Sequence, residues 1–142
     1  MFLLLPVAII FITLREQTKG KLIVLIGAEG QRDIEKRPKL GEIAIRLADI
    51  VVLTAVDPRG QLQKINEQIM QGAKIAGVKL GKNFFIIDDR KEAINFAINE
   101  LPKKGDTVGC FGKGHEKSIN YTGVEEPWSD REAVLEALAD GR

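Results

Sequence analysis

The chain has 142 residues, of which 44% are hydrophobic and 29% charged, and its formal net charge is +1. This length and composition are typical of one globular domain with its own core, and they exclude a disordered or low-complexity chain. The near-zero net charge argues against a nucleic-acid partner, and the single cysteine, Cys110, excludes an internal disulfide and indicates a reducing compartment such as the cytoplasm.

The chain begins with an almost wholly apolar segment, Met1 to Leu14. This segment is shorter than the ~20 apolar residues that span a bilayer, and it lacks the basic start and the cleavage site of a signal peptide. We therefore expect no membrane partner and predict a helix from Phe11 to Thr18 that packs on the domain and is ended by Gly20. Membrane attachment or export through the same segment is the alternative.

Four short apolar runs alternate with segments in which apolar residues recur at helical spacing. The expected strands are Leu22–Ile26, Ile50–Leu53, Phe84–Ile87 and Thr107–Phe111. The expected helices lie near 38–48, 62–76, 93–101 and 130–139, and a short edge strand is expected at Ser118–Tyr121. This alternation predicts an α/β fold in three layers, with a mostly parallel sheet and helices on both of its faces.

Parallel strands end at one edge of their sheet, and this rim is where such folds bind ligands. Three of the expected loops at the rim carry charged side chains. These residues are Arg32 and Asp33, Asp57 and Arg59, and Lys113, His115 and Glu116. Because arginine pairs with a carboxylate or phosphate and glutamate accepts from an ammonium, the set suits a zwitterion such as an amino acid, or a phosphate with a polar tail. The alternative is that these charges pair with one another and only hold the loops in place.

Several known motifs are absent from the sequence. No Gly-x-x-x-x-Gly-Lys-Ser/Thr loop is present to hold a triphosphate, and Gly27-Ala28-Glu29-Gly30 does not match the Gly-x-Gly-x-x-Gly dinucleotide fingerprint. The single histidine excludes a His-rich metal site, and we assign no metal ligands and no catalytic residue. Cys110 is interpreted as an inert core residue, and Trp128 as a packing anchor for the last helix.

Five motifs follow one another along the chain. They are Gly-x-x-Gly-x-Arg-Asp-x-x-Lys-Arg-Pro from Gly27, Ala-Asp-x-Val-Val-Leu-Thr-x-x-x-Pro-Arg from Ala48, Asp-Asp-Arg-x-Glu-Ala-Ile from Asp88, Gly-Asp-x-Val-x-x-x-Gly-Lys-Gly-His-Glu from Gly105, and Ser-Asp-Arg-Glu from Ser129. In this order and spacing the set resembles the C-terminal domain of the Mur ligases, and most closely the members that add the third residue of the peptidoglycan stem peptide. The resemblance extends from about Thr13 to Leu138. It divides the chain into an apolar segment of uncertain role, residues 1–12, and an amino-acid-binding domain, residues 13–142.

The resemblance implies a Rossmann-like fold and a role in peptidoglycan synthesis. The family uses ATP and Mg²⁺ to join an amino acid, here expected to be meso-diaminopimelate, to UDP-N-acetylmuramoyl-dipeptide. A central domain outside this chain, in cis or in trans, would bind most of the ATP and Mg²⁺. The expected partners are thus a diamino acid and that central domain, and the chain alone is expected to be inactive.

The resemblance also implies roles for individual residues. Arg32 matches an arginine that contacts the incoming diamino acid, and Arg59 matches one associated with its distal carboxylate. Gly112 and Glu116 match residues that hold its distal ammonium. Asp57 stands where the family motif has Asn, so it would repel a ligand carboxylate unless it turns to an ammonium or to Arg59. The expected supporting residues of the rim are Asp33, Lys113 and His115.

Three alternatives remain open. A free-standing domain that captures an amino acid, or docks on a partner ligase, would bind a ligand without turning over ATP. A domain like that of folylpolyglutamate synthase fits Pro58-Arg59 and Gly112–Glu116 less well, and a membrane-tethered accessory protein would use residues 1–14. The first eleven residues do not resemble the family's upstream segment, so the chain is interpreted as a fragment or as a standalone domain with an unrelated start.

Overall fold

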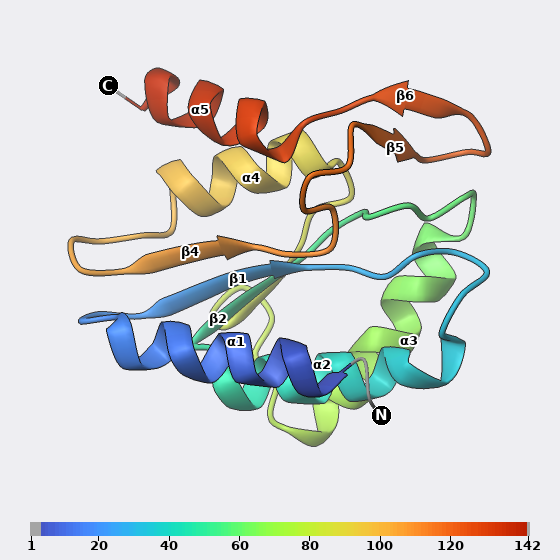
Figure 1. Ribbon diagram of the computed structural model, residues 1–142. Coiled ribbons are helices and arrows are strands. Elements are labelled where there is room, and N and C mark those ends of the chain that lie inside the picture. Colours follow the sequence, from blue (N-terminus) through green and yellow to red (C-terminus); the bar gives the residue numbers. More distant parts are fainter. Residues whose placement is uncertain (1–3, 142) are drawn as a thin grey trace.

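The centre of the fold is a parallel sheet of four strands, seen in a computed structural model that describes residues 4–141 (Figure 1). The strands are β1 (Leu22–Ile26), β2 (Ile50–Leu53), β3 (Phe84–Ile86) and β4 (Thr107–Cys110). Their order across the sheet is β3-β2-β1-β4, and every neighbouring pair is parallel. All five residues of the central strand β1 are buried, because helices cover both of its faces.

Helices form the two outer layers (Figure 1). The helices of the first layer are α1 (Leu4–Gln17), α2 (Arg37–Leu47), which follows the short 3₁₀ turn η1 (Ile34–Lys36), and α3 (Leu62–Ile75). The helices of the second layer are α4 (Arg90–Asn99) and α5 (Asp130–Asp140). Successive residues of β1 point into opposite layers: Val24 packs with the first group, and Leu25 packs with the second. The three-layer α/β prediction is confirmed.

Local sequence explains where the helices begin. Pro38 occupies the first turn of α2, where its missing N–H is not needed. The Asp89 side chain accepts from the backbone N–H of Glu92 and caps α4, and the Ser129 side chain caps α5 by accepting from the N–H of Glu132.

The segment after β4 differs from the prediction. The expected edge strand at Ser118–Tyr121 is β5 (Ser118–Asn120), but it does not join the main sheet. It pairs instead with β6 (Glu125–Pro127) in an antiparallel hairpin. Strand β6 was not predicted, because glutamate and proline are poor strand formers. The hairpin lies over the loop that follows β2, where the backbone N–H of Arg59 donates to the carbonyl of Asn120 at 3.1 Å.

Helix α1 begins at Leu4 and is therefore longer than the predicted helix from Phe11. Phe11 is fully buried and packs against Phe111, with ring centroids 4.8 Å apart, whereas Leu5, Ile9 and Ile12 are exposed. The helix runs across the boundary expected after residue 12, and residues 1–3 of that segment lie outside the described residues. Within residues 4–141, no helix is both long and apolar enough to cross a bilayer.

A buried ion pair between Arg90 and Asp130 ties the layers together at the rim. The Nε and Nη2 groups of Arg90 each donate to a different Asp130 oxygen at 2.8 Å. The same guanidinium donates to the carbonyls of Ala55, at 2.9 Å, and Phe111, at 3.1 Å. One side chain thus connects the ends of β2 and β4 to the start of α5.

We expect Asp130→Asn to lower the free energy of unfolding by about 3 kcal/mol, because it leaves the Arg90 charge buried without a counter-ion. The matched control is Glu136→Gln, which breaks the exposed Lys91–Glu136 pair and should cost less than about 1 kcal/mol. Urea unfolding of the three proteins measures both effects. Equal losses in the two variants would contradict a structural role for the buried pair.

We also expect the destabilisation caused by Asp130→Asn to depend on pH. Burial by itself raises the pKa of the Asp130 carboxyl, but the Arg90 guanidinium and the Trp128 indole outweigh burial, so the net pKa lies below its ordinary value. The stability that this lowered pKa provides is complete above the unfolded value of about 4 and is lost as the pH falls through the folded value. The difference in urea midpoint between wild type and Asp130→Asn should therefore stay constant above about pH 5 and shrink as the pH falls below about 4.

Candidate functional site

The loops that follow β1, β2 and β4 meet at the carboxyl edge of the sheet, as predicted. The backbone N–H of Gly30 donates to the carbonyl of Asp57 at 2.7 Å. A side chain at Gly30 would place its first carbon 2.2 Å from the carbonyl oxygen of Pro58, so only glycine allows this approach. Gly112 adopts φ = 108°, and a side chain there would collide with Val56. Both glycines are therefore required for the loops to touch.

Lys113 lies at the centre of the rim. Its ammonium is 2.9 Å from each carboxylate oxygen of Asp57 and 3.0 Å from Oε1 of Glu116. The Lys113 side chain is fully buried, that of Asp57 is 6% exposed, and that of Glu116 is 49% exposed. Asp57 also accepts from the backbone N–H of Asn120 at 2.8 Å. The anion that departs from the family pattern thus turns to an ammonium, one of the two arrangements that would keep it from repelling a ligand carboxylate.

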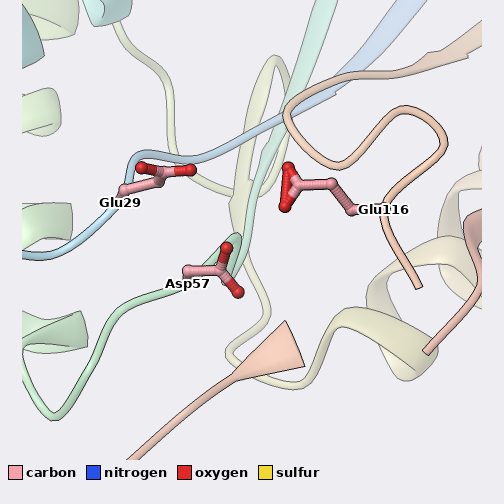
Figure 2. Close-up of side chains that lie close together, drawn as sticks. All are labelled: Glu29, Asp57 and Glu116. Atoms are coloured by element: carbon pink, nitrogen blue, oxygen red, sulfur yellow. The ribbon is translucent and has the colours of Figure 1, made fainter. Parts of the chain in front are cut away.

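Three carboxylates face one another around this lysine. Oxygens of Glu29, Asp57 and Glu116, one from each loop, all lie within 4.8 Å of one another, and Figure 2 shows the side chains converging. With Lys113 included, the cluster carries a formal charge of −2. Oxygen ligands of this kind suit a hard metal ion or an ammonium, and the Lys113 ammonium already contacts two of the three. Glu29 and Glu116 are the members that remain partly exposed.

Of the two predicted arginines, Arg32 lies beside Glu29 of this cluster, and Arg59 follows Asp57 by two residues. Arg32 is 71% exposed, and its Nη1 is 3.6 Å from Oε2 of Glu29. Arg59 has a left-handed backbone, with φ = 48°, and its N–H is held by the hairpin. Within residues 4–141 no carboxylate forms an ion pair with Arg59, so its guanidinium is available for a ligand anion.

Other predicted rim residues have different surroundings. Asp33 pairs with Lys36 at 3.4 Å and lies before η1, and His115 is exposed.

The two residues interpreted as structural are Cys110 and Trp128. Cys110 is half-buried, and burial raises the pKa of its thiol to about 11, so the thiol stays protonated at neutral pH. Trp128 packs on the α4–α5 layer and donates to Asp130 at 2.7 Å, in agreement with its interpretation as a packing anchor.

Three features of the rim were not predicted from the sequence. Glu29 was noted only as part of a loop that does not match the dinucleotide fingerprint, and Asn120 was not considered because the hairpin was not expected. A buried arginine, Arg37, was also missed. It lines a cavity of about 200 Å³ between α1, α2 and the loops after β1 and β4, beside Arg32 and Gly112. A charged stretch such as Glu35-Lys36-Arg37 ordinarily indicates a solvated surface.

Known proteins resemble this chain in sequence and in fold. Residues 8–114 match the sequence family described as "Mur ligase, glutamate ligase domain". A relative from Aquifex aeolicus, UDP-N-acetylmuramoyl-L-alanyl-D-glutamate–2,6-diaminopimelate ligase, is 42% identical over 128 residues, which are 89% of this chain and 25% of the relative. The UDP-N-acetylmuramyl-tripeptide synthetase of Roseiflexus sp. is 39% identical over 132 residues, which are 92% of this chain and 26% of the relative.

A solved structure of a UDP-N-acetylmuramoyl-L-alanyl-D-glutamate–2,6-diaminopimelate ligase superposes with a TM-score of 0.83 at 31% identity. The match covers 94% of this chain and 26% of the solved chain. The chain therefore spans about a quarter of the length of these relatives.

The central lysine provides a test of how the site is held together. We expect Lys113→Met to lower the free energy of unfolding by about 3–5 kcal/mol, because Asp57 would remain buried without its counter-ion. Adding Asp57→Asn to that variant should restore part of the loss. The control Lys39→Met removes one partner of the 3.7 Å Lys39–Glu42 pair, in which the lysine is 53% exposed, and should cost less than about 1 kcal/mol. A loss at Lys113 no larger than at Lys39 would show that the buried pair does not hold the rim.

Proposed function

The chain belongs to the Mur ligase family, within which it corresponds to the glutamate ligase domain, and we propose that it binds the amino acid for an ATP-dependent ligase of peptidoglycan synthesis. The amino acid is a diamino acid, with meso-diaminopimelate favoured over lysine. The bond formed is an amide between this amino acid and the UDP-N-acetylmuramoyl-dipeptide.

One observation carries the proposal: the rim presents an ammonium acceptor, and two residues after its Asp57 stands an arginine with which no carboxylate of the described residues forms an ion pair. The acceptor is the carboxylate cluster of Glu29, Asp57 and Glu116, whose charge of −2 remains after Lys113 is included. The arginine is Arg59. A ligand that carries an ammonium and a carboxylate at one end matches both groups, and meso-diaminopimelate has such an end where lysine has only the ammonium.

Each residue of the rim then has a distinct task. Glu116 is half-exposed and accepts only one hydrogen bond from Lys113, which leaves it able to accept from a ligand ammonium. Arg59 pairs with the distal carboxylate, and the exposed Arg32 assists from the other side. Gly112 lets the backbone approach the ligand. Asp57 belongs to the site through Lys113, which it holds in place and neutralises.

ATP fits this chain poorly, because the sequence lacks a phosphate-binding glycine loop and the anionic rim cluster would repel phosphates. In the family, ATP activates the carboxylate of the acceptor. The residues of this chain would bind the distal ammonium and carboxylate of the incoming amino acid. This contact would orient the amino acid so that its reacting amine faces the activated carboxylate. The central ATP-binding domain is therefore the expected partner, and we infer a cytoplasmic location for both.

The names of the relatives are consistent with meso-diaminopimelate as the amino acid, but they do not exclude lysine. The ligase of Aquifex aeolicus is named for 2,6-diaminopimelate, whereas the synthetase of Roseiflexus sp. is named for its tripeptide product alone. The residues around the distal end of the ligand must therefore decide which amino acid this chain accepts.

The first test concerns the division of labour between domains. The purified chain, supplied with ATP, Mg²⁺, the UDP-linked dipeptide and meso-diaminopimelate, should form no tripeptide. A chimera in which the chain replaces the matching quarter of the Aquifex aeolicus ligase should form it. Both are measured by chromatography of the UDP-linked products. Tripeptide formed by the chain alone, or an inactive but folded chimera, would overturn the proposal.

The second test concerns the choice of amino acid. In the same chimera, Arg59→Ala should reduce kcat/KM for meso-diaminopimelate relative to lysine by about tenfold to over a hundredfold, since a charged hydrogen bond contributes roughly 1.5–3 kcal/mol. Arg46→Ala, which removes an exposed arginine paired with Glu42 on α2, serves as the control and should leave the ratio unchanged. An unchanged ratio in Arg59→Ala would make Arg59 a structural loop residue.

A further inference from the structure

Arg37 is a buried cation that has no anionic partner. The described residues contain three buried cations, and two of them pair with buried carboxylates: Arg90 with Asp130, and Lys113 with Asp57. Arg37 is only 2% exposed, yet no carboxylate within residues 4–141 forms an ion pair with it. Burial of an unpaired charge is costly, so such a group is normally accompanied by a counter-ion.

The hydrogen bonds of Arg37 are incomplete as well. Nη1 donates to the Gln68 side chain at 2.7 Å, and Nη2 donates to the carbonyls of Glu29, at 2.9 Å, and Arg32, at 3.5 Å. These acceptors are neutral, and the buried Nε has no acceptor among the residues that the structure describes. Burial accordingly lowers the pKa of the Arg37 guanidinium from its ordinary value, although arginine remains charged at neutral pH.

Arg37 lines the cavity of about 200 Å³ that lies beside the rim. Most of the cavity wall is apolar. The apolar lining residues are Val7, Ile26, Ala28, Leu40 and Phe111. A wall of this kind accommodates a short hydrocarbon chain, and a single uncommitted N–H on a buried cation suits a monoanion better than a phosphate dianion, which needs several donors.

We propose that this cavity binds a carboxylate carried on a short aliphatic chain, with the carboxylate paired to Arg37. The cavity adjoins the rim and shares Glu29, Arg32 and Gly112 with it, whereas Asp57, Arg59 and Glu116 are not among the residues that line it. The carboxylate belongs either to a free aliphatic acid or to the incoming amino acid. The proposal does not rest on the ligase function, since cavity and cation both belong to this chain.

The experiment is a binding series on the purified 142-residue chain. Isothermal titration and thermal unfolding are carried out with pentanoate, its neutral analogue pentanamide, inorganic phosphate and meso-diaminopimelate, at constant ionic strength. Pentanoate should bind saturably, raise the unfolding midpoint, and bind at least tenfold more tightly than pentanamide or phosphate.

Two variants and one control locate the site. Arg37→Met should abolish the preference for pentanoate over pentanamide, and Ala28→Phe, which fills the cavity but keeps the cation, should abolish binding of both. Arg46→Met removes an exposed arginine of the same helix and should change neither. Ala28→Phe keeps the test valid if Arg37→Met does not fold.

The source of the carboxylate follows from competition. If meso-diaminopimelate displaces pentanoate and loses affinity in Arg37→Met, the carboxylate is that of the amino acid. If it neither displaces pentanoate nor loses affinity, the site takes a separate acid. The proposal is overturned if pentanoate binds no better than pentanamide, if phosphate binds equally well, or if both Arg37→Met and Ala28→Phe bind pentanoate as the wild type does. None of these outcomes would alter the selectivity expected of Arg59.

Discussion

The buried guanidinium of Arg90 is the interaction on which the rim depends. It joins the backbone after β2, the backbone after β4 and the first residue of α5, which belong to three separate parts of the chain. Because α5 is preceded by the β5–β6 hairpin, fixing its start also fixes the hairpin over the loop after β2. Asn120 of the hairpin then binds both Asp57 and Arg59 through its backbone. The position of the proposed ligand-binding groups is thus set by a residue that has no place in the ligand site itself.

The same arrangement explains how the rim can be densely charged and still well ordered. Asp57 and Lys113 form a buried pair in which each neutralises the other, and their geometry is fixed by three hydrogen bonds and the Asn120 amide. Glu29 and Glu116, which remain partly exposed, keep their charges at the surface, where hydration makes a charge inexpensive. The buried part therefore supplies rigidity, and the exposed part supplies the charge that a ligand ammonium can meet.

The sequence was sufficient to predict the layers of the fold and the meeting of the loops, but it could not predict the pairing of side chains. Strands such as Leu22–Ile26 are continuous apolar runs, and parallel connectivity alone brings their ends together. The contact of Lys113 with Asp57 joins residues 56 positions apart, and local pattern carries no information about it. The burial of Arg37 was hidden by its charged neighbours, and β6 was hidden by its glutamates and proline. The early start of α1 was missed because that helix is apolar on all sides and shows no helical period.

Glu29 connects the two proposed binding sites. Its backbone carbonyl accepts from Arg37, while its carboxylate belongs to the cluster around Lys113. A single residue of the loop after β1, Glu29, therefore lies between the buried guanidinium of Arg37 and the carboxylates of Asp57 and Glu116. A ligand carboxylate at Arg37 and a ligand ammonium at the cluster would both lie beside Glu29. Neither ligand would have to order this residue, because the Arg37 hydrogen bond to its carbonyl and the bridge to Asp57 already hold it.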